Sequence, residues 1–148
     1  MTKYQGSCHC GAVKFEATLE LEFGTHCNCS ICTKTMWTGA HCKPPAFTLL
    51  AGEAELTGYA WGHKVSTRYF CKHCGVQCFG KGSLAELGGD FVSINVNCLD
   101  GVDPHALPLR HWDGRHDNWH AGMRETPWPI SRSATSSASG RPISGINQ

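Results

Sequence analysis

The sequence lacks long hydrophobic runs and an excess of charge of one sign. No apolar run approaches the roughly 18–20 residues of a membrane-spanning helix, and the first residues, MTKYQGSCHC, lack the apolar segment of a signal peptide. The net charge of +1 gives no electrostatic reason to expect a nucleic acid or an anionic membrane as a partner. We therefore expect a soluble, cytoplasmic protein without such partners.

A sustained helical repeat is also missing, and the sequence alternates instead. Apolar residues at Val13, Phe15, Ala17 and Leu19 are separated by polar ones, which is the pattern of a half-buried strand. One short helical turn fits residues 30–36. Turn residues in AGE, GKGS and LGGD separate further segments rich in β-branched and aromatic residues. These segments predict strands that begin near Phe47, Ala54, Lys64 and Phe91. The sequence thus predicts a mainly β fold, with antiparallel sheets in a sandwich-like arrangement.

The C-terminal third has a different composition. From Asp100 the chain is rich in Pro, His and Trp, which predicts an irregular arm that Trp112, Trp119 and Trp128 pack onto the sheets. Residues 131–148, SRSATSSASGRPISGINQ, contain too little apolar surface to offset the entropy of ordering them. With 148 residues in all, we expect one domain over residues 1–130 and a flexible Ser/Gly-rich tail over 131–148.

Cysteine, in contrast, is abundant, with ten in the chain. Such thiols either form disulfides in an oxidising compartment or bind metals in a reducing one. The even number favours disulfides, whereas the clustered spacing and the missing secretion signal favour metals. Two cysteines separated by one residue rarely form a disulfide with each other, because disulfide geometry needs converging Cβ vectors. We therefore expect metal ligands.

Two pairs of cysteines have the spacing of a structural metal site. Cys8 and Cys10 lie two residues apart, so both side chains point to one face of an extended segment. Cys71 and Cys74 form a C-x-x-C pair followed by glycine, which is the pattern of a zinc knuckle. Together the pairs would make a closed set of four thiolates without room for a substrate. The alternatives are core thiols or a redox pair, although a thioredoxin-type motif would need a βαβ context.

The segment HCNCSICTK contains three more thiols, Cys27, Cys29 and Cys32. Three thiolates and one open position are the usual arrangement of a catalytic zinc. Since three thiolates leave a formal negative charge on such a site, we expect it to handle a thiol rather than polarise a carbonyl group. The open position would take water or a substrate thiol. Alternatively, Cys42 or Cys98 folds back as a fourth ligand, and the second site is then structural.

Other residues have less specific signals. Cys78 is expected to be a buried apolar cysteine rather than a ligand. Among the nine histidines, His26 and His41 lie nearest to the second cysteine cluster and are the acid–base candidates. Arg68 could bind a carboxylate, but its place in the strand favours a solvated residue.

The segments GSCHCGAVKFE, CNCSICTK and RYFCKHCGVQCF, in this order and separation, resemble the glutathione-dependent formaldehyde-activating enzyme family. The resemblance covers about residues 4–100 and extends more weakly to about residue 130. It implies a β-tent fold of antiparallel sheets around a structural zinc ion. It also implies two Zn²⁺ ions per chain, a structural one held by Cys8, Cys10, Cys71 and Cys74, and a catalytic one held by Cys27, Cys29 and Cys32.

The same resemblance implies a carbon–sulfur lyase that acts on small thiol and aldehyde substrates. The reaction would join glutathione and formaldehyde to give S-hydroxymethylglutathione, or split this adduct. Two alternatives belong to other classes of function. One is a non-catalytic, zinc-stabilised binding module, as in the centromere protein V-like relatives of the family. The other is a redox sensor whose three-cysteine cluster releases zinc when it is oxidised to a disulfide.

Overall fold

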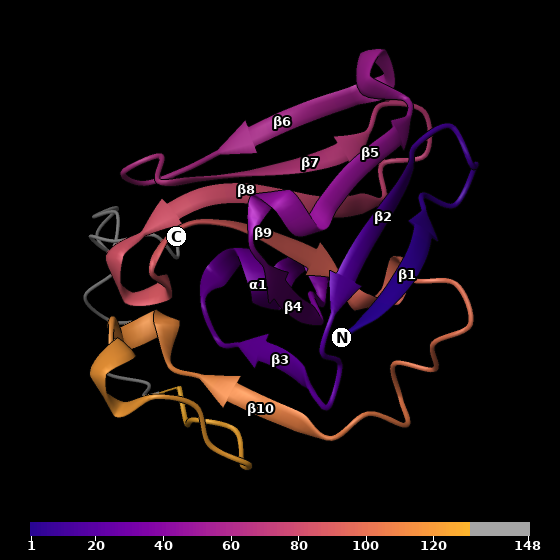
Figure 1. Ribbon diagram of the computed structural model, residues 1–148. Helices are drawn as coiled ribbons and strands as arrows, with labels where there is room; N and C mark the ends of the chain where they lie inside the picture. Colours follow the sequence, from indigo (N-terminus) through magenta and orange to yellow (C-terminus); the bar gives the residue numbers. More distant parts are fainter. Residues whose placement is uncertain (131–148) are drawn as a thin grey trace.

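Two β-sheets form the body of the protein (Figure 1), which we describe over residues 1–130 of a computed structural model. The smaller sheet has the strand order β1-β2-β5, and the larger has the order β10-β3-β4-β9-β8-β7-β6. The predicted tail, residues 131–148, lies outside the described range. The strands are β1 (Thr2–Ser7), β2 (Lys14–Leu19), β3 (Gly24–Cys27), β4 (Gly39–Cys42), β5 (Phe47–Ala51), β6 (Leu56–Ala60), β7 (Ser66–Cys71), β8 (Gln77–Leu84), β9 (Gly89–Asn95) and β10 (Leu109–Trp112).

Helical structure is short throughout the described part of the chain. The helix α1 spans Ser30–Thr35, where the sequence predicts a helical turn. No helix within residues 1–130 is long and apolar enough to cross a membrane. Single turns of 3₁₀ helix lie at Pro44–Ala46, Glu53–Glu55, Ala85–Leu87, Val96–Cys98, Gly114–His116 and Trp119–Ala121.

The predicted mainly β fold is confirmed, and so are the five predicted strands. The alternating segment that contains Phe15, Ala17 and Leu19 forms β2, and all three side chains are buried. The other four predicted strands are β5, β6, β7 and β9. Within residues 1–130, all strand pairs are antiparallel except one.

The segment GKGS does not form the predicted turn but lies within β8. A Cβ atom on Gly80 would lie 2.8 Å from the Ser93 Oγ, and one on Gly82 would lie 2.7 Å from the Phe91 ring. Both glycines therefore allow neighbouring strands and side chains to approach closely, which is a second use of glycine in sheets besides turns.

The C-terminal arm is not irregular throughout, because it contributes β10. This strand pairs in parallel with β3, with Leu109 opposite Gly24 and Trp112 opposite Cys27. The pairing places the arm along the edge of the larger sheet (Figure 1). Four residues, LRHW, are too few to show an alternating pattern, so the sequence did not reveal this strand.

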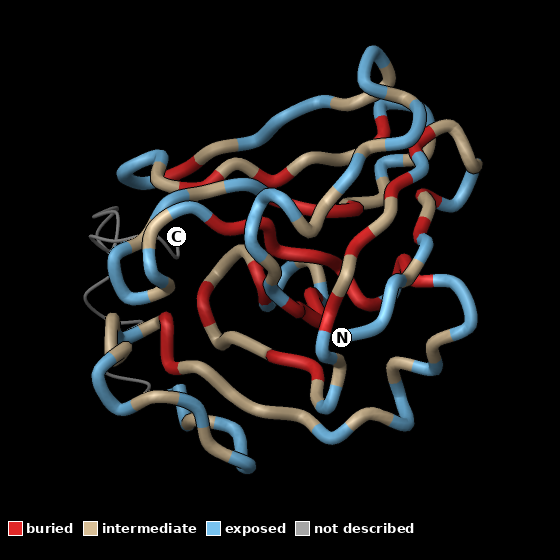
Figure 2. Tube along the Cα trace, in the orientation of Figure 1, coloured by how far each residue is buried: buried red, intermediate tan, exposed pale blue. Residues whose placement is uncertain are grey.

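The main hydrophobic core is built around aromatic rings of β2, β5 and β8 that pack against one another. The ring centroids of Phe15 and Phe79 lie 6.1 Å apart, and Phe47 packs 5.8 Å from Phe15 and 4.7 Å from Phe79. Phe15 and Phe79 are at most 1% exposed. Figure 2 shows that buried segments follow the strands in the interior, whereas the peripheral turns are exposed. This core joins the two sheets.

Replacing Phe15 by alanine tests the importance of this core. We expect the variant to lose about 3–5 kcal/mol of unfolding free energy, because a cavity replaces a fully buried ring. Urea unfolding measures the loss. Lys14→Ala, on the exposed side of the same strand, is the control and should change the stability by less than about 0.5 kcal/mol. Equal losses in the two variants would contradict this description of the core.

Candidate metal centres and the adjoining cavity

Four predicted ligands, Cys8, Cys10, Cys71 and Cys74, lie together in the structure. Their sulfur atoms are all within 4.8 Å of one another, and the Cys10 Sγ is 3.6 Å from the Sγ atoms of both Cys8 and Cys71. Four sulfurs around zinc at ~2.3 Å would be separated by about 3.8 Å along the tetrahedron edges. The donor set and its spacing therefore fit a zinc ion.

This first cluster connects the two sheets. Cys8 directly follows β1 of the smaller sheet, whereas Cys71 ends β7 of the larger one. Gly11 and Gly75, which follow the two cysteine pairs, have φ angles of 79° and 74°, the left-handed conformation that glycine adopts without strain. The two turns thus direct thiols from separate sheets to one point.

Backbone N–H groups favour ionised sulfur in the first cluster. The N–H of Val13 donates to the Cys8 Sγ at 3.3 Å. Hydrogen bonds from the backbone of Cys10 and Val76 lower the pKa of Cys74 to about 6. Because a thiolate rather than a thiol binds a metal, these donors prepare the cluster for an ion.

The second cluster contains Cys27, Cys29 and Cys32, as the sequence predicts. Cys27 ends β3, Cys29 caps the N-terminus of α1, and Cys32 lies in the first turn of α1. Their sulfur atoms are within 4.8 Å of one another. Cys29 is fully buried and Cys32 is 7% exposed, whereas Cys27 is half-buried. A strand end followed by one helical turn therefore collects three thiols in six residues.

The alternative fourth ligands do not join this cluster. Among residues 1–130, the groups that could hold a metal contain neither Cys42 nor Cys98. The Cys98 thiol donates to the Gln77 carbonyl at 3.5 Å instead, and Cys42 packs against the main core. Cys78 is a fully buried core residue, as predicted. The second cluster is thus a set of three thiols.

Arg68 is the main residue of the site that the sequence analysis misjudged. It is only 7% exposed, although a solvated residue was predicted. Its Nη2 donates to the Cys32 Sγ at 3.4 Å, and its Cζ lies 3.7 Å from the centroid of the Trp37 ring. A guanidinium group is weakly hydrated and stacks on aromatic rings, so this environment can hold it out of water.

The charge of the second cluster is concentrated on Cys32. The pKa of Cys32 lies well below its usual value, because the thiols of Cys27 and Cys29 donate to its sulfur and because Arg68 is positively charged. The pKa of Cys29 is raised by its hydrogen bonds with the thiols of Cys27 and Cys32 and by burial. The protein therefore holds one thiolate readily, and a cation is needed to hold three.

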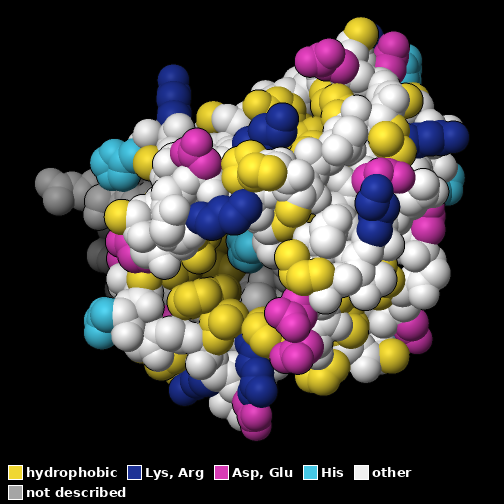
Figure 3. Space-filling model, in the orientation of Figure 1, with side chains coloured by type: hydrophobic (Ala, Val, Ile, Leu, Met, Phe, Trp, Pro, Cys, Tyr) yellow, Lys and Arg dark blue, Asp and Glu magenta, His cyan; other side chains and the backbone are white. Residues whose placement is uncertain are grey.

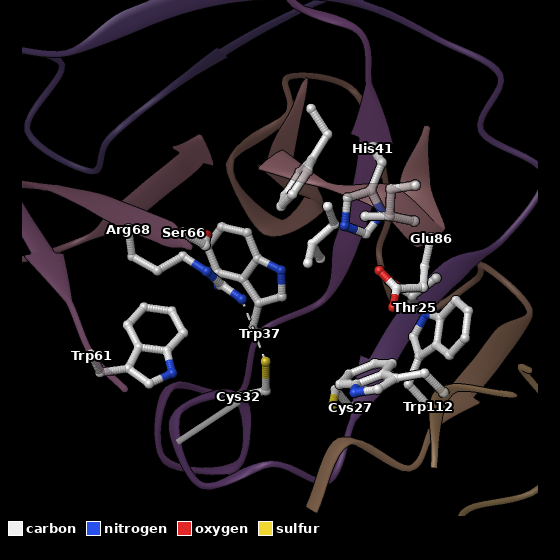
Figure 4. Close-up of a pocket in the computed structure, with 14 residues that line it drawn as sticks. Thr25, Cys27, Cys32, Trp37, His41, Trp61, Ser66, Arg68, Glu86 and Trp112 are labelled. Atoms are coloured by element: carbon white, nitrogen blue, oxygen red, sulfur yellow. Dashed lines mark hydrogen bonds between the residues drawn. The ribbon is translucent and has the colours of Figure 1, made fainter. Parts of the chain in front are cut away.

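A cavity of about 200 Å³ adjoins the second cluster, with Cys27 and Cys32 in its wall. Figure 3 shows a hollow lined largely by hydrophobic side chains, and Figure 4 shows the residues around it. Trp112 and Trp119 of the arm lie in contact there, with ring centroids 5.6 Å apart, so the arm forms part of the wall. The tryptophans that line the cavity are Trp37, Trp61, Trp112 and Trp119.

The two candidate histidines have different positions. His41 lines the cavity but is itself exposed to solvent. Desolvation by the surrounding protein and the charge of Arg68 lower its pKa. His26 points away from the cavity and forms a 3.0 Å hydrogen bond with the Thr38 hydroxyl. Alternation along β3 separates it from Thr25 and Cys27, which face the cavity.

The arm also fixes the loop between the ligands. Asn28, which lies between Cys27 and Cys29, donates to Asp113 at 2.7 Å and accepts from the Arg115 N–H at 2.8 Å. The Nε of Arg115 donates to the Asn28 carbonyl at 3.0 Å. Asp113 is 5% exposed. Two residues of the arm thus hold the peptide that carries two of the three thiols.

Replacing Asp113 by alanine tests this support. The partly buried Asn28 amide would lose its acceptor, so the loop would no longer be fixed, and we expect metal affinity at the second cluster to fall about 10–100-fold. Competition with a chelator measures the affinity of each cluster. The first cluster should be unchanged, and so should both clusters in Asp103→Ala, a turn residue elsewhere in the arm. Unchanged affinity in Asp113→Ala would show that Asn28 needs no such support.

Comparisons with known proteins agree with the cysteine pattern. Residues 3–113 match the family described as glutathione-dependent formaldehyde-activating enzyme, a range that contains both clusters. A crystal structure of a Rhodobacter sphaeroides protein, determined by structural genomics, is similar, with a TM-score of 0.63 and 27% sequence identity. The similarity covers 71% of this chain and 98% of that chain. The chain therefore belongs to the glutathione-dependent formaldehyde-activating enzyme family.

Proposed function

We propose that the protein is a zinc-dependent enzyme of the carbon–sulfur lyase type, which forms or splits an adduct of a small aldehyde with a thiol such as glutathione. S-hydroxymethylglutathione is the simplest such adduct. The observation that carries the proposal is the cluster of three thiols in the wall of a cavity, next to a separate cluster of four. The name of the family, which mentions glutathione and formaldehyde, supports the proposal of thiol and aldehyde substrates.

The two clusters suit different tasks. Cys8, Cys10, Cys71 and Cys74 provide the complete ligand set of a tetrahedral zinc and connect the sheets, so we assign them a structural role. Cys27, Cys29 and Cys32 leave one coordination position open, and two of them face the cavity. We assign this second set to catalysis.

The chemistry of the open position follows from its ligands. When bound by the three thiolates, a zinc ion supplies an electrophilic centre that lowers the pKa of a thiol at the open position. With such an ion the cluster carries a formal charge of −1, and the guanidinium of Arg68 offsets it. An incoming thiolate is therefore not repelled by a net negative site.

The remaining groups of the cavity act on the carbonyl partner. In the addition, the sulfur–carbon bond forms, the π-electron pair of the carbonyl group moves to its oxygen, and this oxygen takes a proton. His41, neutral near pH 7 because its pKa is lowered, can donate a hydrogen bond to that oxygen. The tryptophans give the cavity an apolar wall. The reverse sequence splits the adduct.

Regulation by oxidation is a second candidate function. The pKa of Cys32 is lowered, which favours its thiolate, and two other thiols lie within 4.8 Å. Oxidation could therefore join Cys32 to a neighbour and release the metal. The binding-module alternative has less support, because the cavity wall is mainly apolar and the net charge of the chain is only +1, whereas nucleic-acid binding needs a basic surface.

Zinc analysis combined with exchange spectroscopy tests the proposed roles. Wild type should contain close to two zinc ions per chain and should accelerate, in NMR exchange experiments, the interconversion of glutathione plus formaldehyde with S-hydroxymethylglutathione. Cys29→Ser should contain one zinc ion and lose the acceleration while keeping its fold. Cys74→Ser should unfold, because the free energy of binding a structural zinc, on the order of 10 kcal/mol, contributes to folding.

Cys42→Ser is the matched control, since it removes a half-buried thiol outside both clusters. It should retain both zinc ions and the full rate. Equal unfolding of the Cys29 and Cys74 variants would contradict the division of roles. Two bound zinc ions without any acceleration would exclude the enzymatic function for this adduct, and reversible zinc loss in dilute peroxide would then favour the redox function.

A further inference from the structure

The guanidinium of Arg68 has hydrogen-bonding capacity that the protein does not use. Its Nη2 donates to Cys32, but its Nη1 is buried and has no hydrogen-bond partner among residues 1–130. A buried donor without a partner costs free energy, and more so when it is charged. Since Arg68 lines the cavity, a ligand in the cavity can supply the missing acceptor.

A second donor without a partner lies on the same side of the cavity. The indole Nε1 of Trp61 is buried and unpartnered within the described part of the chain. The Arg68 Cζ lies 5.9 Å from the centroid of the Trp61 ring. Figure 4 shows both side chains near Cys32, with Glu86 and Trp112 on the other side of the cavity. Both groups only donate hydrogen bonds, so the expected partner is an acceptor, and the charge of Arg68 favours an anion.

The protein itself does not provide this anion. Glu86 is the carboxylate in the cavity wall, yet no ion pair joins it to Arg68 in residues 1–130. The thiolate of Cys32 already accepts from Nη2. The planar guanidinium, stacked on Trp37, is therefore held in a fixed orientation with one terminal nitrogen available. Such a group binds carboxylates with defined geometry.

We propose that the cavity recognises a carbonyl compound that carries a carboxylate within a few bonds of its carbonyl group and an apolar body, with Arg68 and Trp61 binding the carboxylate. This inference rests on the proposed function for the identity of the reaction. It extends that function by assigning a substrate class, hydrophobic oxo acids, that formaldehyde does not represent.

The position of Arg68 assigns the carboxylate to the carbonyl compound rather than to the thiol. Its Nη2 is 3.4 Å from a sulfur of the second cluster, so a group bound at Nη1 lies close to the reacting atoms. The carboxylates of glutathione are many bonds away from its sulfur, whereas an oxo acid carries its carboxylate beside the carbonyl carbon. The aromatic wall and the volume of about 200 Å³ suit a larger body than formaldehyde.

The reaction balances without an oxidant or a reductant. The thiolate sulfur forms a bond to the carbonyl carbon, the π bond breaks, and its electron pair stays on the oxygen. That oxygen takes the proton that the thiol released. The carboxylate bound by Arg68 and Trp61 is unchanged, so it serves recognition alone.

Binding of unreactive ligands tests the site independently of catalysis. Calorimetry on the zinc-loaded protein would compare phenylacetate with phenylacetamide, its neutral analogue. We expect wild type to prefer phenylacetate about 10- to 100-fold, as a charged hydrogen bond of about 1.5–3 kcal/mol implies. Arg68→Met should remove the preference, and Trp61→Phe, which keeps the ring and loses the N–H, should reduce it several-fold.

Lys81→Met is the matched control, because it also removes one positive charge but lies at an exposed position of β8. It should bind both ligands like wild type. Equal binding of the two ligands by wild type, or no binding of either, would overturn the proposal, and so would an unchanged preference in Arg68→Met. If Arg68→Met does not fold, the wild-type preference and Trp61→Phe decide, and an unchanged preference in Trp61→Phe overturns the assignment.

A rate comparison separates this inference from the proposed function. With glutathione as thiol, wild type should accelerate adduct formation with glyoxylate more than with acetaldehyde, and Trp61→Phe should reduce the difference. Equal acceleration of both aldehydes in all variants would support the enzyme and overturn the carboxylate site. Selective binding of phenylacetate without acceleration of either aldehyde would support the carboxylate site and overturn the enzymatic function.

Discussion

The attraction between the buried guanidinium of Arg68 and the sulfur of Cys32 is the interaction on which the second cluster depends. Three thiols within 4.8 Å of one another would repel one another as thiolates in a partly apolar environment. A positive charge 3.4 Å from one of them offsets part of this repulsion before any metal binds. Trp37 holds the guanidinium in place by stacking at 3.7 Å, so the charge cannot move into solvent.

The two sheets and the arm have separate tasks around this interaction. The larger sheet supplies Arg68 from β7 and Cys27 from β3, which lie far apart in the strand order. The first cluster connects this sheet to β1, and the aromatic core around Phe15 packs between the sheets. The arm closes the cavity with Trp112 and Trp119. Elements outside the second cluster therefore determine the shape of the cavity.

Local spacing in the sequence was sufficient to group Cys27, Cys29 and Cys32, and to recognise each of the two cysteine pairs, because residues two or three apart are neighbours in space whatever the rest of the chain does. Joining the two pairs, which lie 61 residues apart, needed the further argument that four thiolates complete a tetrahedral site. Local spacing also revealed the strands with clear alternation, such as β2. Arg68 could not be judged in this way, since its burial depends on Cys32, which is 36 residues away. The strand β10 was missed because its pairing with β3 joins distant segments. Gly80 and Gly82 were interpreted as turn residues, although the crowding that requires them comes from other strands.

The hydrogen bond between Asn28 and Asp113 joins residues that lie 85 positions apart in the sequence. During synthesis it can therefore form only after most of the chain has been made. All four thiols of the first cluster have been synthesised once Cys74 is added. The loop of the second cluster, although it lies in the N-terminal third, stays without its support until Asp113 and Arg115 have followed. Since N-terminal parts of a chain emerge first from the ribosome, the first cluster can assemble before the arm completes the larger sheet and the cavity. The first cluster thus has all its thiols early in synthesis, and the loop of the second cluster gains its support last.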